Sequence, residues 1–409
     1  MSTKTTYKQT ELGLIPEDWE VKKFNKFSKF YSGGTPLTSK SEYYGGEIPF
    51  IKSGEIYYDR TEQFLTQEGL NNSSAKLVYR GDLLYALYGA NSGEVAISQL
   101  EGAINQAILC IQQNKDEAET IYLYNYLKLE KSNIINKFLQ GGQGNLSADI
   151  IKNLQIPLPP LPEQKKIADC LSTWDVAIEK QNALINVLTQ RKKALMQQLL
   201  TGKKRLPGFS GEWKEVKLGD LFEKINRKNE EGNTNVVTIS AQRGFVKQTD
   251  FFNKSVASET LDNYSLIYHG EFCYNKSYSN GYPLGATKRL IAFEKAVVTT
   301  LYICFKIKDQ KKSNGSFFEQ FFEANSLDRS LIKIAQEGGR AHGLLNVSLS
   351  DFFNIKIKLP PIEEQTAIAE ILAAADRELQ LQKEKLAQLQ AQKKGLMQVL
   401  LTGKKRLIN

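Results

Sequence analysis

Several loops of this chain combine aromatic, amide and basic side chains, a combination suited to contact with nucleic-acid bases. Arginine and lysine pair with guanine, and asparagine and glutamine pair with adenine, in the major groove of DNA. A polar loop of this composition is equally often an ordinary turn, so each loop alone leaves both interpretations open. The candidates for DNA contact are Tyr43, Tyr44, Lys52, Tyr88, Asn91, Ser92, Gln143, Asn145, Gln242, Arg243, Lys276, Tyr278, Asn280, Arg340 and His342.

Two of the candidate groups lie in glycine-rich loops at residues 141–145 and 338–343. Each loop leads into an N-x-S sequence, at Asn145 and at Asn346. Glycine lets the backbone come close to a phosphate or a base edge. Glycine also ends helices, so a plain helix end followed by a turn is an equal alternative.

Motifs for catalysis are missing from the sequence. It contains no (D/N)-P-P-(Y/F) sequence of an amino-methyltransferase, no Walker A sequence, no G-x-S-x-G and no H-E-x-x-H. The E-x-K sequences that begin at Glu20 and Glu215 resemble the end of a nuclease site. No suitably placed aspartate precedes both copies, which favours a charge pair at a strand edge. The sequence therefore predicts a binding scaffold and no catalytic site.

Composition narrows the class further. The net charge of +9 suits a polyanionic partner, although solubility alone is the alternative explanation. No apolar run reaches the ~18 residues of a membrane span, and the first ten residues do not form a secretory signal. We therefore expect a cytoplasmic protein with reduced thiols and no metal site. The four cysteines, which include no C-x-x-C, are Cys110, Cys170, Cys273 and Cys304.

The elements that must position these loops are marked by an internal repeat. Residues 158–206 align without a gap to residues 359–407, with 24 identities in 49 positions and a constant offset of 201. Such a period is too long for a solenoid repeat. It predicts two similar halves, each a globular part followed by a long helix. About 40 residues at ~1.5 Å each give a helical rod of roughly 60 Å.

Each copy of the repeat carries apolar residues at alternating spacings of four and three, which is typical of a coiled coil. Polar residues interrupt both seams at matching places, Gln181 and Gln382, then Lys192 and Lys393. Two matched seams in one chain most simply bury each other, and separate packing of each helix on its own domain is the alternative. The apolar seam residues are Ile167, Leu171, Trp174, Ile178, Ile185, Leu188, Leu195 and Leu199, then Ile368, Leu372, Leu379, Leu386, Leu389, Leu396 and Leu400.

The two globular parts share one plan. Each opens with a tryptophan-led segment, continues through a Gly-acid turn into an apolar strand, and later shows a helical stretch and a glycine loop. We expect two mixed α/β domains related by a pseudo-twofold. The expected boundaries are residues 1–157 and 207–358 for the domains, with the helices at residues 158–206 and 359–409.

Together these signals resemble the specificity subunits of type I restriction–modification systems. The resemblance depends on Tyr31–Pro36, on Tyr44–Ile51, and on the duplicated L-P-P-x-x-E-Q and M-Q-x-L-L-T-G sequences at the two ends of each helix. It implies two target recognition domains, each reading half of a bipartite double-stranded DNA site, and an antiparallel pair of helices that sets the gap between them.

The resemblance also implies partners. Two methyltransferase (modification) subunits would bring S-adenosylmethionine, and restriction (translocase and nuclease) subunits would use ATP and Mg²⁺, while this chain would bind no cofactor and catalyse nothing. Two alternatives remain open at this point. One is a DNA methyltransferase or nuclease-related enzyme of fused restriction type with degenerate motifs, and the other is a coiled-coil adaptor without a role on DNA.

Overall fold

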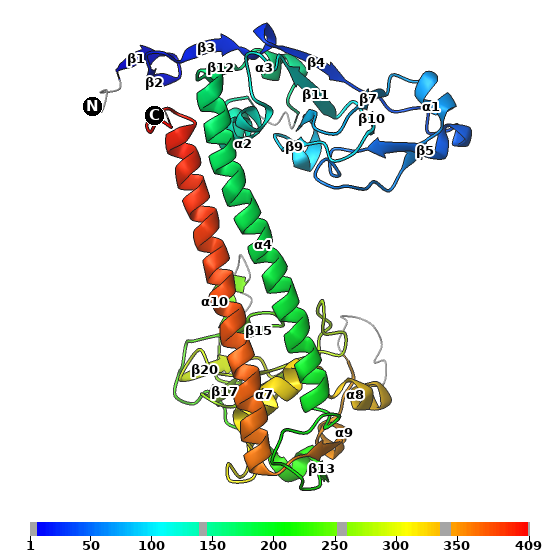
Figure 1. The fold of residues 1–409 in the computed structure, drawn as a ribbon. Coiled ribbons are helices and arrows are strands. Elements are labelled where there is room, and N and C mark those ends of the chain that lie inside the picture. The colour runs from blue at the N-terminus through cyan, green and yellow to red at the C-terminus, as the bar shows by residue number, and fades with distance from the viewer. Residues whose placement is uncertain (1–5, 139–144, 252–259, 336–344, 408–409) are drawn as a thin grey trace. The chain divides into compact units, whose positions relative to one another are not determined.

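The computed structural model describes residues 6–138, 145–251, 260–335 and 345–407. The chain divides into two compact units, with residues 1–182 and 384–409 in unit 1 and residues 183–383 in unit 2. The chain contains two long helices, α4 (Leu161–Leu199) and α10 (Ile362–Leu400). One end of each helix belongs to unit 1 and the other end belongs to unit 2 (Figure 1). Both helices begin close to the positions that the repeat predicts.

A four-stranded antiparallel sheet with the order β4–β11–β8–β9 lies at the centre of the unit 1 domain. Its inner strands are short apolar runs with almost every side chain buried, as expected for strands covered on both faces. Helix α2 packs on this sheet and contributes Tyr122 to a core that also holds Trp19 and Tyr85. The bounds are β4 (Ser28–Ser32), β8 (Leu83–Ala86), β9 (Val95–Ile97), β11 (Ile108–Gln113) and α2 (Thr120–Phe138).

A second sheet of unit 1, with the order β6–β5–β10–β7, is mixed because β5 and β10 run parallel. Two antiparallel pairs, β1–β2 and β3–β12, complete the strands of the unit. The bounds are β1 (Tyr7–Thr10), β2 (Gly13–Pro16), β3 (Glu20–Lys23), β5 (Tyr44–Ile51), β6 (Phe64–Leu65), β7 (Lys76–Val78), β10 (Gly102–Ile104), β12 (Gln155–Leu158), α1 (Gln67–Asn71) and α3 (Ala148–Lys152).

Unit 2 repeats the central plan with the antiparallel sheet β14–β21–β18–β19 and the pair β13–β22. Its core is rich in phenylalanine, and Phe222, Phe305 and Phe318 meet edge to face. The bounds are β13 (Lys214–Lys217), α5 (Leu218–Leu221), β14 (Phe222–Lys224), β18 (Phe272–Asn275), β19 (Ala286–Arg289), β21 (Ile303–Ile307), α7 (Gly315–Glu323), α8 (Asp328–Ile334), α9 (Leu349–Asn354) and β22 (Lys356–Leu359).

The units differ beside their central sheets. Unit 2 has two antiparallel pairs, β15–β16 and β17–β20, where unit 1 has its mixed sheet. The bounds are β15 (Val237–Ser240), β16 (Gly244–Lys247), α6 (Gln248–Phe251), β17 (Ser265–Tyr268) and β20 (Lys295–Val298). The two halves therefore share a central framework and differ in the strands beside it.

The long helices pack against each other inside each unit. In unit 1 the start of α4 lies beside the end of α10, because Arg406 pairs with Glu163 and Lys393 pairs with Asp175. The equivalent pairs of unit 2, which the offset of 201 predicts, join Arg205 to Glu364 and Lys192 to Asp376. In both units the numbering rises along one helix as it falls along the other, so the expected antiparallel arrangement is confirmed.

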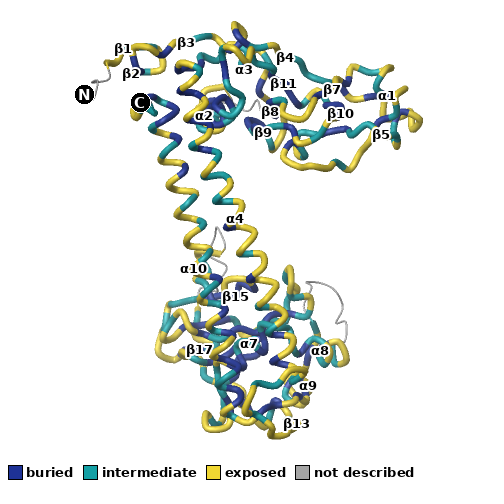
Figure 2. Tube along the Cα trace, in the orientation of Figure 1, coloured by how far each residue is buried: buried dark blue, intermediate teal, exposed yellow. Residues whose placement is uncertain are grey.

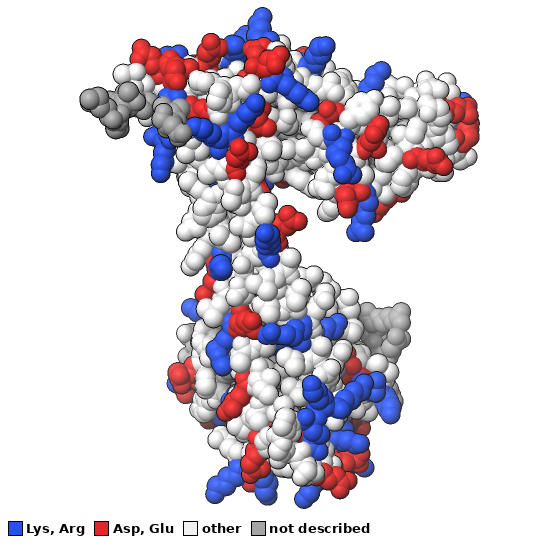
Figure 3. All heavy atoms as spheres, viewed as in Figure 1, with Lys and Arg blue, Asp and Glu red and all other residues white. Residues whose placement is uncertain are grey.

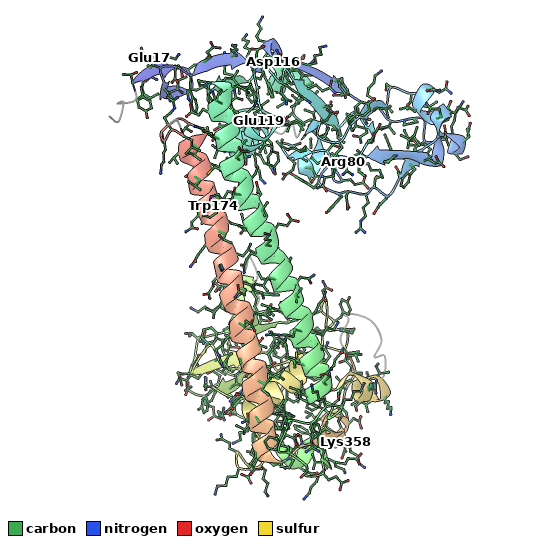
Figure 4. The ribbon with its side chains drawn as sticks, viewed as in Figure 1. Glu17, Arg80, Asp116, Glu119, Trp174 and Lys358 are labelled. Carbon is green, nitrogen blue, oxygen red and sulfur yellow. The ribbon has the colours of Figure 1, made fainter. Side chains whose placement is uncertain are left out.

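The apolar residues of the predicted seam are shielded from solvent on both helices. Every apolar seam residue is buried or half-buried, while exposed residues separate them along both helices (Figure 2). Trp174, on α4, is one of the half-buried seam residues (Figure 4). Near the helix ends the seam enters the domain cores, with Leu171 and Leu400 in that of unit 1 and Leu199 and Leu372 in that of unit 2. Each core is therefore built on both helices, and neither helix packs on one domain alone.

Candidate nucleic-acid interface

The same two loops meet in both units. In unit 1 the loop after β8 is joined to the segment before α3, because the backbone N–H of Leu146 donates to the carbonyl of Leu87 at 2.9 Å. In unit 2 the loop after β18 is joined to the segment before α9 by a similar bond, in which the backbone N–H of Leu345, two residues before the counterpart of Leu146, donates to the carbonyl of Lys276 at 3.2 Å. The predicted glycine loops directly precede Leu146 and Leu345 in the chain.

The unit 1 loop projects Tyr88 from the end of β8. Its side chain is 36% exposed, and the turn that follows begins at Gly89, where φ is +75°. Ser92 closes the turn, because its hydroxyl donates to the carbonyl of Leu87 at 3.1 Å. Asn91 is half-buried in the turn, and Asn145 is exposed next to Leu146. Tyr88, Asn91 and Asn145 thus lie near the same pair of loops, whereas Ser92 is buried within the turn.

The candidates on and before β5 lie in the second sheet of unit 1. Tyr43 is only 5% exposed, and its hydroxyl accepts a bond from Lys40 at 3.1 Å. Tyr44 is half-buried and donates to the carbonyl of Pro36 at 2.7 Å, and Lys52 is half-buried. Buried Tyr43 and Ser92 have almost no surface for contact with DNA, so we leave both out of the proposed interface.

The unit 2 loop spans residues 276–285 and projects Tyr278, which is 68% exposed. The turn between β15 and β16 lies against it, because Gln242 Nε2 donates to the carbonyl of Asn280 at 3.0 Å. Arg243, in the same turn, is exposed and borders a cavity of about 270 Å³ that Lys288 and Glu319 also line. The structure thus brings together the five described unit 2 candidates: Gln242, Arg243, Lys276, Tyr278 and Asn280. Gln143, Arg340 and His342 fall outside the described residues.

A junction that the sequence reading did not find fixes each domain to the helix pair. In unit 1 the buried carboxylate of Glu163, 1% exposed, accepts bonds from Arg406 at 2.6 and 2.7 Å and from the Trp19 indole at 3.1 Å. Arg406 also pairs with Asp18 and thereby lowers the pKa of that carboxyl group, while the bonds to Glu163 raise the pKa of the guanidinium.

Unit 2 contains the same junction, in which Glu364 accepts bonds from Arg205 and from the Trp213 indole. The neighbouring glutamines are equivalent too. Gln164 binds the backbone of Glu117 and Glu119, just before α2, and of Pro159, just before α4. Gln365 binds the backbone of Lys312, Asn314 and Pro360 in the same way. Burial raises the pKa of Glu119, which lies just before α2 (Figure 4). The available signal was the duplication of the E-Q and K-K-R sequences at the two ends of each helix.

The E-x-K carboxylates are held in ion pairs. Glu20 pairs with Lys22 at 2.8 Å on β3, and Glu215 pairs with Lys356 at 2.8 Å between β13 and β22. These pairs agree with the strand-edge interpretation and remove the nuclease-like motif as support for an enzyme. Within the described segments, no cluster of three or more His, Cys, Asp or Glu could hold a metal ion, and no helix is long and apolar enough to cross a membrane.

Charge is distributed over both units. Figure 3 shows Lys and Arg interleaved with Asp and Glu, and a denser group of Lys and Arg on the surface of the unit 2 domain. With a net charge of +9, the surface attracts phosphate groups without being uniformly basic. Selectivity for one DNA sequence would then depend on the loops and not on overall charge.

Comparison with known proteins agrees with a duplicated reader built on paired helices. Two segments, residues 16–190 and 210–391, each match the family described as the type I restriction modification DNA specificity domain. The two matches together cover most of the chain. The chain therefore belongs to that family.

The similarity to individual proteins covers nearly the whole chain. The type I restriction enzyme MjaVIII specificity subunit of Methanocaldococcus jannaschii is 27% identical, with 97% of this chain and 95% of that protein covered. Among solved structures, the S subunit of a type I restriction–modification system from M. genitalium has a TM-score of 0.55 at 15% identity, covering 93% of this chain and 96% of that chain. A chain from a study of complex assembly and conformational transition of the type I R-M system has a TM-score of 0.56 at 16% identity, covering 96% and 99%. Both structures share the fold.

Proposed function

We propose that this chain is the sequence-reading subunit of a type I restriction–modification complex and that each unit reads one half of a bipartite double-stranded DNA site. The observation that carries the proposal is the corresponding loop pair of both units, which a backbone bond joins in each, from Leu146 to Leu87 and from Leu345 to Lys276. Equivalent frameworks with different loop side chains suit two half-sites of different sequence. The proposed interface comprises Tyr44, Lys52, Tyr88, Asn91, Asn145, Gln242, Arg243, Lys276, Tyr278 and Asn280, with Gln143, Arg340 and His342 retained as predictions.

The chain itself catalyses nothing in this proposal. Two methyltransferase subunits bring S-adenosylmethionine and modify the site, and restriction subunits use ATP and Mg²⁺ in the cytoplasm. The duplicated helix pair supports two copies of one partner, because pseudo-equivalent surfaces can bind identical chains in equivalent ways. Incubation of the isolated chain with DNA, a labelled methyl donor and Mg²⁺ should give neither methyl transfer nor cleavage.

The decisive experiment maps methylated bases across the host genome with and without this gene. One bipartite motif should disappear when the gene is deleted. Replacement of residues 207–356 by the corresponding domain of another such subunit should then change one half of the motif and preserve the other. A change in both halves, or in neither, would refute the assignment of one half-site to each unit.

A further inference from the structure

The loop pair of each unit projects one aromatic side chain, and we propose that Tyr88 and Tyr278 each stack on a base of their own half-site. This inference rests on the proposed function and adds the mode of contact. Tyr88 follows the last residue of β8 by two positions, and Tyr278 follows the last residue of β18 by three. Single exposed apolar residues need no explanation on their own. Two exposed aromatic residues in the corresponding loops of a duplicated protein, one position apart when β8 and β18 are aligned, do need an explanation.

Exposure of these rings contrasts with the tyrosines just before them. Tyr85 and Tyr274 are fully buried within the same two strands. Each strand therefore buries one tyrosine in its core, and the next tyrosine along the chain is exposed. A ring on the surface is free to stack on any base, because every base presents a π-face.

The unit 2 loop is held rigidly around Tyr278. Ser279 and Tyr282 exchange backbone bonds of 3.2 and 2.8 Å, and Gln242 braces Asn280 from the neighbouring turn. Asn325 donates its side-chain amide to the carbonyl of Gly281 at 3.1 Å. Asn325 is the residue other than glycine with a positive φ, +54°, in the described part of the chain. Asn325 follows the C-cap of α7 in the left-handed conformation that asparagine tolerates, and its side chain ties this helix end to the loop.

A partly buried polar network supports the base of this loop. Tyr282 donates to Glu323 at 2.6 Å and accepts from Lys288 at 3.1 Å, while Lys288 also pairs with Glu323. Lys288 is nearly buried, so a loop position that moved Tyr282 away would remove one of the partners of this ammonium group. The loop is therefore already ordered in the folded protein, and little conformational entropy remains to be lost when it binds DNA. Such an ordered loop favours base stacking, which depends on the position of the ring.

Cationic side chains belong to the same pair of turns as the ring. Lys276 belongs to the same loop, and Arg243 belongs to the turn that Gln242 ties to Asn280. Cations beside an aromatic ring suit DNA, because they bind the phosphates that flank a stacked or partly unstacked base. Insertion of the ring would be easiest at a flexible pyrimidine–purine step, which gives the half-site a preference at a position without a hydrogen bond.

The test uses the full chain assembled with its modification subunit and duplexes that carry the methylation-mapped motif. 2-Aminopurine is placed at each position of the unit 2 half-site in turn, since its fluorescence responds to unstacking. The complex should change the fluorescence at one step, and Tyr278→Ala should abolish that change and weaken binding by about 5- to 150-fold. Tyr278→Phe should retain both, because it keeps the ring and removes only the hydroxyl.

Tyr268→Ala is the matched control, because Tyr268 is 40% exposed and belongs to β17, which ends before the turn that enters β18. It should bind like wild type. Tyr88→Ala should have the corresponding effect in the other half-site only. The stacking proposal would be overturned if Tyr278→Ala kept the wild-type affinity and fluorescence change, or if Tyr278→Phe lost as much of both as Tyr278→Ala. Either result would leave the reading of half-sites untouched. A domain exchange that leaves the motif unchanged would instead overturn the proposed function and the stacking with it.

Discussion

Lys393 on α10 donates to Asp175 on α4 at 2.5 Å inside unit 1. The offset of 201 residues places Lys192 and Asp376 in the same relationship inside unit 2, where they also pair. Each lysine occupies a seam position, and its carboxylate partner lies on the facing helix. A polar residue in a coiled-coil seam fixes register because any other alignment would leave it buried without a partner. We infer that these two pairs set the alignment of α4 against α10.

The first prediction concerns this pair. The Lys393 side chain is 7% exposed and that of Asp175 is 45% exposed, so Asp175→Asn removes the charge partner of a nearly buried ammonium group. We expect a loss of about 1–2 kcal/mol in the free energy of unfolding, discounted for the solvent around Asp175. Urea unfolding followed by circular dichroism measures it. Lys393→Met, which removes the buried charge, should lose less, and a greater loss would contradict the assigned role.

The pH dependence of this pair has a definite sign. Burial holds the pKa of Lys393 below its ordinary value of 10.5. Between the lowered folded value and 10.5, the unfolded chain binds more protons than the folded chain, so this group makes stability rise with pH. The stability of the wild type relative to Lys393→Met should therefore increase as the pH approaches 10.5. A decrease over that window would contradict the lowered pKa.

The second prediction concerns the junction of Glu163 with Arg406. Arg406→Ala leaves a carboxylate that is 1% exposed without its cation, and we expect a loss of about 3 kcal/mol in unit 1. The fluorescence of Trp19, whose indole donates to Glu163, should report the change. Arg205→Ala provides the matched variant in unit 2, where Trp213 is the reporter. Equal stability of wild type and Arg406→Ala would show that the junction does not hold the domain.

Acid should diminish this effect. The hydrogen bond from Arg406 lowers the pKa of Asp18 from its ordinary value of 3.8. A depressed carboxyl pKa gives stability that is present above the unfolded value and is lost as pH falls through the folded value. The difference between wild type and Arg406→Ala should therefore narrow below pH 3.8.

Some of this organisation follows from the sequence and some does not. The repeat and its seam predicted α4, α10 and their pairing, because a heptad pattern is a local property of the chain. The carboxylate partners of Lys192 and Lys393 could not be found in this way, since they are non-seam residues of the other helix. The Glu163 junction was missed for the same reason, because Arg406 lies 243 residues away.

Loop side chains are harder to assign than helices. Tyr43 and Tyr44 are adjacent in one polar aromatic run, yet Tyr43 is buried and Tyr44 is half-buried. The difference arises from packing around β5, where Gly69 of α1 lies against Tyr43. A Cβ atom on Gly69 would lie 2.3 Å from the carbonyl oxygen of Tyr43. Composition carries no information about such a contact. Tyr278 and Arg243 were identifiable as a pair only after the structure joined their two turns.

The third prediction concerns the positioning residue Asn325. Asn325→Ala removes the bond to Gly281 and places a Cβ-bearing residue without a compensating side chain at φ +54°. We expect a loss of about 1–3 kcal/mol in stability and weaker discrimination within the unit 2 half-site. Asn325→Gly should recover most of the stability, because glycine tolerates this φ, but not the discrimination. The discrimination is measured as the rate of methylation of sites that carry a mismatch in one half or the other. An equal loss of discrimination in both halves would contradict a local role of Asn325.

The last prediction concerns the gap between half-sites. A helical insertion that lengthens the helix pair tests whether these helices set the gap. The end of α4 at Leu200–Gly202 is unsuitable for it, because Leu200 is buried in the unit 2 core and Gly202 approaches Trp213. The two Lys–Asp pairs identify a better place. The midpoint between Asp175 and Lys192 falls between Ala183 and Leu184, and the midpoint between Asp376 and Lys393 falls between Glu384 and Lys385. All four flanking residues are exposed.

A helix-favouring tetrapeptide at both midpoints keeps each Lys–Asp pair intact and introduces one four-residue shift, which coiled coils absorb by local unwinding. It adds about 6 Å and turns the chain by roughly 40°. One base pair rises about 3.4 Å, and one turn of DNA takes roughly 10.5 pairs. The double insertion should therefore preserve both half-site sequences and widen the gap by one or two base pairs in methylation maps. A tetrapeptide in one helix alone displaces one member of a pair and should lower stability and methylation. An unchanged gap with full activity in the double insertion would mean that the helices do not set the spacing.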